Sequence, residues 1–253
     1  MTEAEEEPEP LRILCYGDSN TWGCEAITYR RFGARVRWTG VVQRELDKCC
    51  LSLPSKTSYQ ILEEGLSGRT TVWDDPLSVW LPPNDDPSVC NGRKSLMPIL
   101  HSAKPLAAVV LYLGANDLKE RYNNTPMDIA TGVSVLATKI RQAQAGLTPS
   151  RPLPILIVCP PPCTNEEFFQ DLKGAIAKSK RLPEYYETMV NNLGAGNDKK
   201  DCYYLDAGAV PGVVCDGSDG LHLTKEAHGA LGLAIATKLK EMLGLPQGLL
   251  EYS

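Results

Sequence analysis

The chain has 253 residues, of which 43% are hydrophobic and 23% are charged, and its formal net charge is −5. Its Lys and Arg residues are spread along the sequence without a basic stripe, which argues against nucleic acid as a partner. No apolar run is long enough to cross a bilayer, so a membrane is not an expected partner either.

We expect a single α/β domain over residues 11–245. The length suits one well-buried domain, and neither a Gly/Ser linker nor an internal repeat divides the sequence. Residues 1–10 are acidic and contain prolines, and they lack the basic start and apolar core of a secretory signal. We therefore expect a disordered N-terminal tail and a cytoplasmic protein. Residues 246–253 are interpreted as a C-terminal tail.

The nine cysteines are an odd number and show no repeating spacing. Cys15 and Cys159 lie in apolar segments, which favours reduced, buried thiols. The Cys49-Cys50 doublet and the pair Cys159 and Cys163 lack a second ligand pair at zinc-finger spacing. We therefore expect no metal site and no cofactor.

Strands and helices are expected to alternate along the chain. Five apolar runs are predicted as strands: 11–16, 59–64, 106–114, 154–159 and 202–207. The third and fourth runs are almost continuously apolar, which is typical of strands covered on both faces. Helical patterns lie between them: 39–49, 127–146, 181–194 and 225–244. This alternation predicts a doubly wound, mainly parallel five-stranded sheet with helices on both faces.

One long segment, residues 72–98, fits none of these elements. It is rich in Pro, Asp and Asn and contains Trp73 and Trp80, whose surroundings suggest exposure. Long irregular loops in compact domains often act as lids or binding loops. The alternative is a surface excursion that packs at a subunit contact.

Polar turns follow the first three predicted strands. Ser19 lies in "GDSN", Gly68 in "GLSGRTT" and Asn116 in "GAND", and "DGSDGLHLT" before the last helix supplies Asp219 and His222. Such turns meet at the carboxyl edge of a doubly wound sheet. Together they provide a hydroxyl nucleophile, a base with a nearby carboxylate, and polar donors, which are the groups that acyl transfer requires.

These four blocks, in this order and across most of the chain, resemble the SGNH hydrolases of the GDSL esterase/lipase class. "RWTG" at 37–40 and "TPMDIATGVSVL" at 125–136 are similar to its arylesterase/acyltransferase branch. The resemblance implies a flavodoxin-like sheet and a serine esterase. Asn20 stands where the class name has Leu, Arg69 where many members have Asp, and Leu223 where many have Pro. We expect these departures to bear on substrate preference.

The resemblance implies a catalytic triad of Ser19 as nucleophile, His222 as base and Asp219 as its carboxylate partner. A carboxylate three residues before the imidazole can accept its second N–H and stabilise the imidazolium. Asp216, in the same turn, is the rival for this role, and turn formation is the alternative for either aspartate. Surface or packing roles are expected for the remaining histidines, His101 and His228.

By the same resemblance, an oxyanion hole is formed by the backbone N–H groups of Ser19 and Gly68 and by the side-chain amide of Asn116. Glycine at position 68 would let the backbone approach a substrate closely. Two alternatives stay open, because Gly68 could be a turn glycine and Asn116 could cap a helix.

The function expected from this site is hydrolysis of small, short-acyl carboxylic esters through an acyl-enzyme, with transfer of the acyl group to alcohols as a second outcome. Trp22, Trp80 and Leu81 are the candidate substrate-binding residues, because they could roof the site and limit acyl length. A catalytically silent binding or scaffold protein is the alternative. A nucleotide-binding domain ranks last, because "GDSNTWG" lacks the G-x-G-x-x-G pattern.

We also expect a homo-oligomer, chiefly because the arylesterase/acyltransferase branch assembles in this way. Trp73, Trp80 and the tail "LPQGLLEY" offer apolar surface that a monomer would leave exposed to water.

Overall fold

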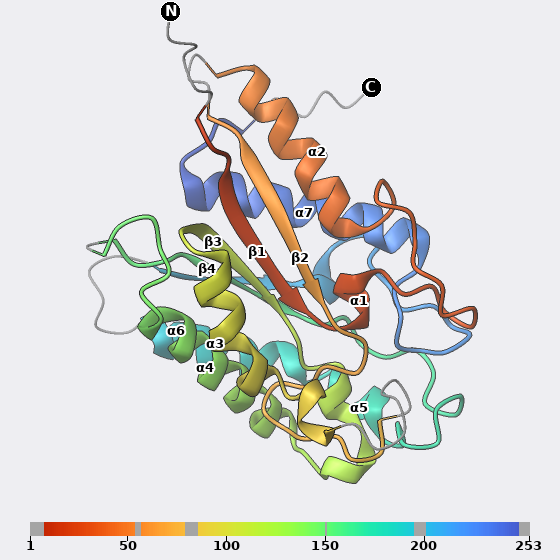
Figure 1. Cartoon of the computed structure of the whole chain (residues 1–253). Helices are drawn as coiled ribbons and strands as arrows, with labels where there is room; N and C mark the ends of the chain where they lie inside the picture. Colours follow the sequence, from red (N-terminus) through yellow and green to blue (C-terminus); the bar gives the residue numbers. More distant parts are fainter. Residues whose placement is uncertain (1–7, 54–56, 79–85, 150, 195–200, 248–253) are drawn as a thin grey trace, which may run out of the picture.

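The computed structural model describes most of the chain, namely residues 8–53, 57–78, 86–149, 151–194 and 201–247. Five strands form one parallel sheet in the order β2-β1-β3-β4-β5 (Figure 1). Their bounds are β1 (Leu11–Gly17), β2 (Tyr59–Gly65), β3 (Leu106–Tyr112), β4 (Ile155–Cys159) and β5 (Cys202–Asp206). This is the flavodoxin-like order, so the predicted fold class is confirmed.

Helices cover both faces of the sheet (Figure 1). The long helices are α2 (Trp38–Leu51), α3 (Gly92–Ala103), α4 (Pro126–Gln142), α6 (Leu182–Gly194) and α7 (Lys225–Leu243). The short ones are α1 (Ser19–Trp22), α5 (Ala175–Ser179), η1 (Pro87–Cys90), η2 (Asn116–Leu118), η3 (Glu120–Tyr122) and η4 (Ala207–Ala209). Among the helices that the structure describes, none is long and apolar enough to cross a membrane.

The side chains of β1 alternate between two buried clusters. Ile13 and Cys15 pack with α2 and α7 on one face, whereas Leu14 and Tyr16 pack with α3, α4 and α6 on the other. This alternation follows from the two-residue period of a strand. Every residue of β3 and β4 is buried, as their continuous apolar runs predicted.

Local sequence sets the starts of the two longest helices. Before α4, the Thr125 hydroxyl accepts the N–H of Asp128, and the Asp128 carboxylate accepts the N–H of Thr125. Before α7, the Thr224 hydroxyl accepts the N–H of Ala227 at 3.0 Å. Gly244, in the left-handed conformation with φ of 68°, ends α7.

Two predicted boundaries differ from the structure. The helix predicted over 127–146 ends at Gln142, because the backbone of residues 145 and 146 instead pairs with Leu106 at the start of β3. The segment 72–98, predicted as irregular, contains η1 and the start of α3. Pro98 lies inside α3, where a proline lacks the N–H donor of a helical residue and is normally interpreted as a helix stop.

The ends of three strands lie at one level. Gly17, the last residue of β1, pairs with Gly65 at the end of β2 and with Tyr112 at the end of β3. The turns that follow these strands therefore begin side by side at the carboxyl edge of the sheet.

The packing of α7 against α2 predicts opposite effects for two glycine substitutions. A Cβ at Gly232 would lie 2.5 Å from the Val41 Cβ and 2.8 Å from the Trp38 carbonyl oxygen, whereas a Cβ at Gly229 would meet no atom within 4 Å. We expect Gly232→Ala to lower the free energy of unfolding by about 1–3 kcal/mol through overpacking. Gly229→Ala should raise it by about 0.5–1 kcal/mol by restricting the unfolded chain. Urea denaturation measures both, and equal effects would contradict this account.

Candidate active site

The turn after β1 carries Ser19 as the first residue of α1. Asp18 caps this short helix, because its carboxylate accepts the N–H of Asn20 at 2.9 Å. Ser19 is only 4% exposed. Burial raises the pKa of Asp18 to about 6, although the hydrogen bond from the Asn20 N–H acts in the opposite direction and lowers this pKa. The turn thus holds the Ser19 hydroxyl at the edge of the sheet.

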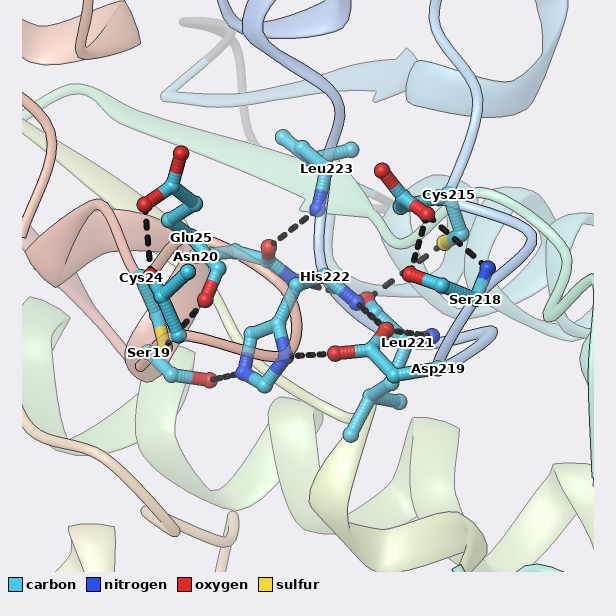
Figure 2. Close-up of polar contacts among 12 residues, drawn as sticks. Ser19, Asn20, Cys24, Glu25, Cys215, Ser218, Asp219, Leu221, His222 and Leu223 are labelled. Carbon is cyan, nitrogen blue, oxygen red and sulfur yellow. Dashed lines mark hydrogen bonds and ion pairs between the residues drawn. The ribbon is translucent and has the colours of Figure 1, made fainter. Parts of the chain in front are cut away.

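His222 and Asp219 come from the turn before α7 and meet Ser19 in a line (Figure 2). His222 Nε2 lies 3.0 Å from Ser19 Oγ, and His222 Nδ1 lies 2.6 Å from Asp219 Oδ2. Asp219 Oδ1 also accepts the backbone N–H groups of Leu221 and His222 at 2.9 and 3.0 Å. The carboxylate therefore shapes its own turn and orients the imidazole.

Burial and the Asp219 carboxylate shift the pKa of His222 in opposite directions. Burial disfavours a charged His222, but the hydrogen bond with Asp219, the neighbouring Cys24 side chain and the negative charge of Asp219 together outweigh this effect and raise the pKa of His222 to about 9. Burial alone would raise the pKa of Asp219, but its hydrogen bonds to His222 and Leu221 lower it. The imidazole can accept a proton from Ser19 at Nε2 only in its neutral form, whose fraction rises as the pH approaches the pKa of His222, and the ionised carboxylate stabilises the imidazolium that results.

Asp216, His228 and His101 do not take part in this line of contacts. Asp216 Oδ1 accepts the N–H of Ser218 at 2.8 Å, so its carboxylate contributes to the turn. His228 is buried in α7 and accepts the N–H of Trp38 at 3.4 Å, and burial lowers the pKa of His228 to about 4. His101 is exposed on α3. Of the three histidines, all of which the structure describes, His222 is the one beside Ser19.

Gly68 and Asn116 lie beside Ser19 in the wall of one pocket, which has a volume of about 60 Å³. Gly68 has a φ of 83°, in the left-handed region that favours glycine. Asn116 begins η2, and its Nδ2 donates to the backbone carbonyl of Arg69 at 3.1 Å. One N–H of this amide is thereby used to hold its orientation, and an amide group has two.

Buried polar side chains tie together the turns after β1, β2 and β3. The Arg69 guanidinium lies over the Tyr16 ring and donates to the carbonyl oxygens of Gly17, at 2.8 Å, and Glu64. The sequence analysis noted Arg69 only as a departure from a family pattern. Its contacts show that it joins the ends of β1 and β2.

A second tie involves Asp117, which the sequence analysis did not single out. Its carboxyl group accepts the backbone N–H of Thr71 at 3.0 Å and the Thr71 hydroxyl. Burial raises the pKa of Asp117 to about 7, although the bonds from Thr71 lower it. This contact fixes the turn after β3 against the turn after β2.

The rest of the pocket wall has an apolar and a polar part. The apolar part consists of Leu77, Phe169, Leu172 and Leu221. Residues 169 to 172 were not predicted as part of the site, because the predicted site consisted of the polar turns after the first three strands and the turn that contains Asp219 and His222. Phe169 and Leu172 belong to the segment after β4, and the carboxyl ends of all parallel strands meet at one edge.

The polar part of the wall is an ion network that the sequence analysis also missed. Lys119, Arg121 and Asp171 line the pocket. Buried Asp75, which does not line it, accepts from Lys119 Nζ at 2.9 Å and from Arg121 at 2.6 Å, and Arg121 also pairs with Asp171. Burial would raise the pKa of Asp75, but the charge and hydrogen bond of Lys119 lower it. Two cations and two anions balance, so this part of the wall is polar without a net charge.

In the described part of the chain, none of the three predicted substrate-binding residues is observed in the wall of this pocket. Trp22, at the end of α1, is not brought to this pocket. Its ring lies 5.4 Å from the Arg31 guanidinium, and Arg31 Nε donates to the Trp22 carbonyl. Trp80 and Leu81 lie outside the described residues. Within the described ranges, no group of three or more His, Cys, Asp or Glu side chains is arranged to hold a metal ion.

Comparisons with known proteins place this site in context. Residues 13–235 match the family model described as GDSL-like lipase/acylhydrolase. The aryl esterase of M. smegmatis is 33% identical, with a TM-score of 0.75 over 92% of this chain and 100% of that one. A carbohydrate acetylesterase from Sinorhizobium meliloti is 32% identical, with a TM-score of 0.75 over 92% and 99% of the two chains. No curated protein sequence matches significantly.

The contact between His222 and Asp219 predicts how the imidazole titrates. NMR titration of the imidazole resonances should give a pKa of about 9 for His222. Asp219→Asn should lower this pKa, because it removes the charged hydrogen-bond partner of the ring and leaves the Cys24 side chain to oppose burial. Asp216→Asn is the matched control, because Asp216 lies in the same turn without contacting the ring. A pKa that stays high in Asp219→Asn would contradict the assignment of its cause.

Proposed function

Since the chain belongs to the family of GDSL-like lipases and acylhydrolases and is a serine ester hydrolase, we propose that Ser19 is its nucleophile, with His222 as base and Asp219 as the carboxylate partner. The observation that carries this proposal is the continuous line of contacts from Ser19 Oγ through both imidazole nitrogens to Asp219. An unassisted serine hydroxyl is a weak nucleophile and needs such a base.

In the proposed mechanism, Ser19 Oγ forms a bond to the ester carbonyl carbon while its proton passes to His222 Nε2. The tetrahedral intermediate then expels the alcohol, which takes the proton from the imidazolium. Water attacks the resulting acyl-enzyme by the same route in reverse, releasing the acid and restoring Ser19. Asp219 stays ionised throughout and stabilises the charged imidazole.

The negative charge on the tetrahedral intermediate needs fixed donors. We assign this role to the backbone N–H groups of Ser19 and Gly68 and to the side-chain amide of Asn116. All three residues line the pocket. One N–H of the Asn116 amide is bonded to the Arg69 carbonyl, which leaves the second N–H as the proposed donor to the substrate oxygen. Donors held in place before the reaction need no reorganisation when the charge develops.

The small volume and apolar wall of the pocket support short acyl groups as the preferred substrates. Leu77, Phe169 and Leu172 surround a space of about 60 Å³, in which an acetyl-sized group fits more readily than a long chain. A relative of this chain is described as a carbohydrate acetylesterase. We propose that alcohols also compete with water for the acyl-enzyme, because an apolar alcohol can pack against this wall and water cannot.

The assignment of Ser19 and Asn116 is tested by labelling with a fluorophosphonate followed by peptide mapping. The native enzyme should be labelled at Ser19, and Ser19→Ala should lose the label and about 10⁴-fold or more of kcat. Asn116→Ala should still be labelled at Ser19 but lose about 10²- to 10³-fold in kcat, because its bond strengthens in the transition state. Heat-denatured enzyme serves as the control for nonspecific labelling. Full activity in Ser19→Ala would overturn the proposed function.

Acyl preference is tested with p-nitrophenyl acetate, butyrate, octanoate and palmitate. We expect kcat/KM to fall by about tenfold or more from acetate to octanoate. Leu77→Ala should narrow the difference between acetate and butyrate, whereas Leu51→Ala, at an exposed site on α2 away from the pocket, should not. Vinyl acetate with benzyl alcohol should give benzyl acetate. Faster turnover of palmitate than of acetate, or no ester product, would contradict the corresponding part of the proposal.

A further inference from the structure

Asn20 joins the turn that carries His222 to the helix that carries Ser19. Its side chain is almost completely buried, at 2% exposure. Its Nδ2 donates to the Leu221 carbonyl at 3.2 Å, and its Oδ1 accepts the N–H of Leu223 at 2.9 Å (Figure 2). The two bonded peptide groups lie on either side of His222, about 200 residues along the chain from Asn20.

We propose that Asn20 is a positioning residue that sets the distance between Ser19 and His222. This inference rests on the proposed function of these two residues. Asn20 directly follows Ser19 in α1, and its own N–H is held by Asp18. Because the Asn20 side chain is short and buried, it holds the backbone on both sides of His222 at a fixed position relative to Ser19.

The bonds within the His222 turn cannot perform this task. Asp219 Oδ1 holds the N–H groups of Leu221 and His222, and the His222 carbonyl accepts the N–H of Asp216 at 2.7 Å. These contacts fix the imidazole relative to Asp219, but they do not fix it relative to α1. The two bonds of Asn20 connect the turn to α1 through its backbone, and so they act on the separation of 3.0 Å between His222 Nε2 and Ser19 Oγ.

Only a side chain with both a donor and an acceptor can bind the two peptide groups at once. The carboxamide of Asn20 matches a carbonyl on one side of His222 and an N–H on the other. Leucine has the same branched arrangement of side-chain heavy atoms but offers neither group, so it would leave the buried Leu221 carbonyl and Leu223 N–H without these partners. Asn20→Leu therefore removes the positioning bonds while keeping the branched shape of the side chain, and Asn20→Ala removes them without adding volume.

The chain offers a matched control in Asn91, which is 4% exposed. Its Nδ2 donates to the Val72 carbonyl and to Asp74, both at 2.8 Å, and its Oδ1 accepts the N–H of Arg93 at the start of α3. Asn91 thus also holds backbone through a buried amide, but it does not contact the Ser19 or His222 turns. Asn91→Leu and Asn91→Ala should lower the melting temperature without a comparable loss of kcat.

The experiment compares Asn20→Leu and Asn20→Ala with the two Asn91 variants. We expect each Asn20 variant to lose about 10²-fold in kcat and in the rate of fluorophosphonate labelling, with KM within about twofold, because misplacement of a reacting group by about 1 Å costs this much. The NMR pKa of His222 should remain near 9, because the contact with Asp219 persists. Asn20→Ala provides a second readout should the leucine variant fail to fold.

The outcomes separate this inference from the proposed function. Labelling at Ser19 in the native enzyme, together with a selective loss of kcat in the Asn20 variants, supports both. A second outcome is that Ser19 is labelled but a folded Asn20 variant has a kcat no lower than the corresponding Asn91 variant. This outcome overturns the positioning role of Asn20 alone. A fall in the pKa of His222 to about 6.5 in an Asn20 variant would also overturn it, because Asn20 would then act through Asp219. Full activity in Ser19→Ala overturns the proposed function itself.

Discussion

The whole site depends on three parallel strands that end at the same level. Because Gly17 pairs with both Gly65 and Tyr112, the chain leaves β1, β2 and β3 side by side. Buried polar contacts then fasten the three turns to one another, with the Arg69 guanidinium on the Gly17 carbonyl and the Asn116 amide on the Arg69 carbonyl. A change in register at any of these strands would therefore move the proposed nucleophile relative to the proposed oxyanion donors.

Three buried carboxyl groups near this edge have pKa values that are shifted in different directions because their surroundings differ. Asp18 accepts its hydrogen bond from the backbone N–H of Asn20, and Asp117 accepts from the N–H and hydroxyl of Thr71, while burial raises the pKa of Asp18 to about 6 and that of Asp117 to about 7. Asp219 instead faces an imidazole that can carry a proton, and its pKa is lowered despite burial. The first two therefore act as hydrogen-bond acceptors that hold turns, whereas Asp219 is the carboxylate suited to stabilise an imidazolium.

The sequence predicts those parts of the molecule that depend on local pattern. The continuous apolar runs of β3 and β4 indicate buried parallel strands, and the polar turns containing Ser19 and His222 indicate where strands and helices meet. Features that depend on distant partners are not visible in this way. Asn20 contacts residues about 200 positions away, and α3 begins at the Asn91 cap although Pro98 suggests an irregular segment. The pocket wall after β4 escaped prediction because Phe169 belongs to no regular motif.

Asp219 and Asn20 act on different features of the site, namely the orientation of the His222 ring and its distance from Ser19. Asp219 orients the His222 ring and also holds the backbone of its turn, so its loss changes both the charge and the shape of that turn. Asn20 carries no charge and does not bond the ring, so its loss changes position while the electrostatic environment of the imidazole is retained. Arg69 and Asn116 hold the turns after β2 and β3 against the end of β1. Since the turns after β1, β2 and β3 and the turn before α7 are all held through hydrogen bonds to backbone groups, the site can be held ready for the transition state before any substrate binds.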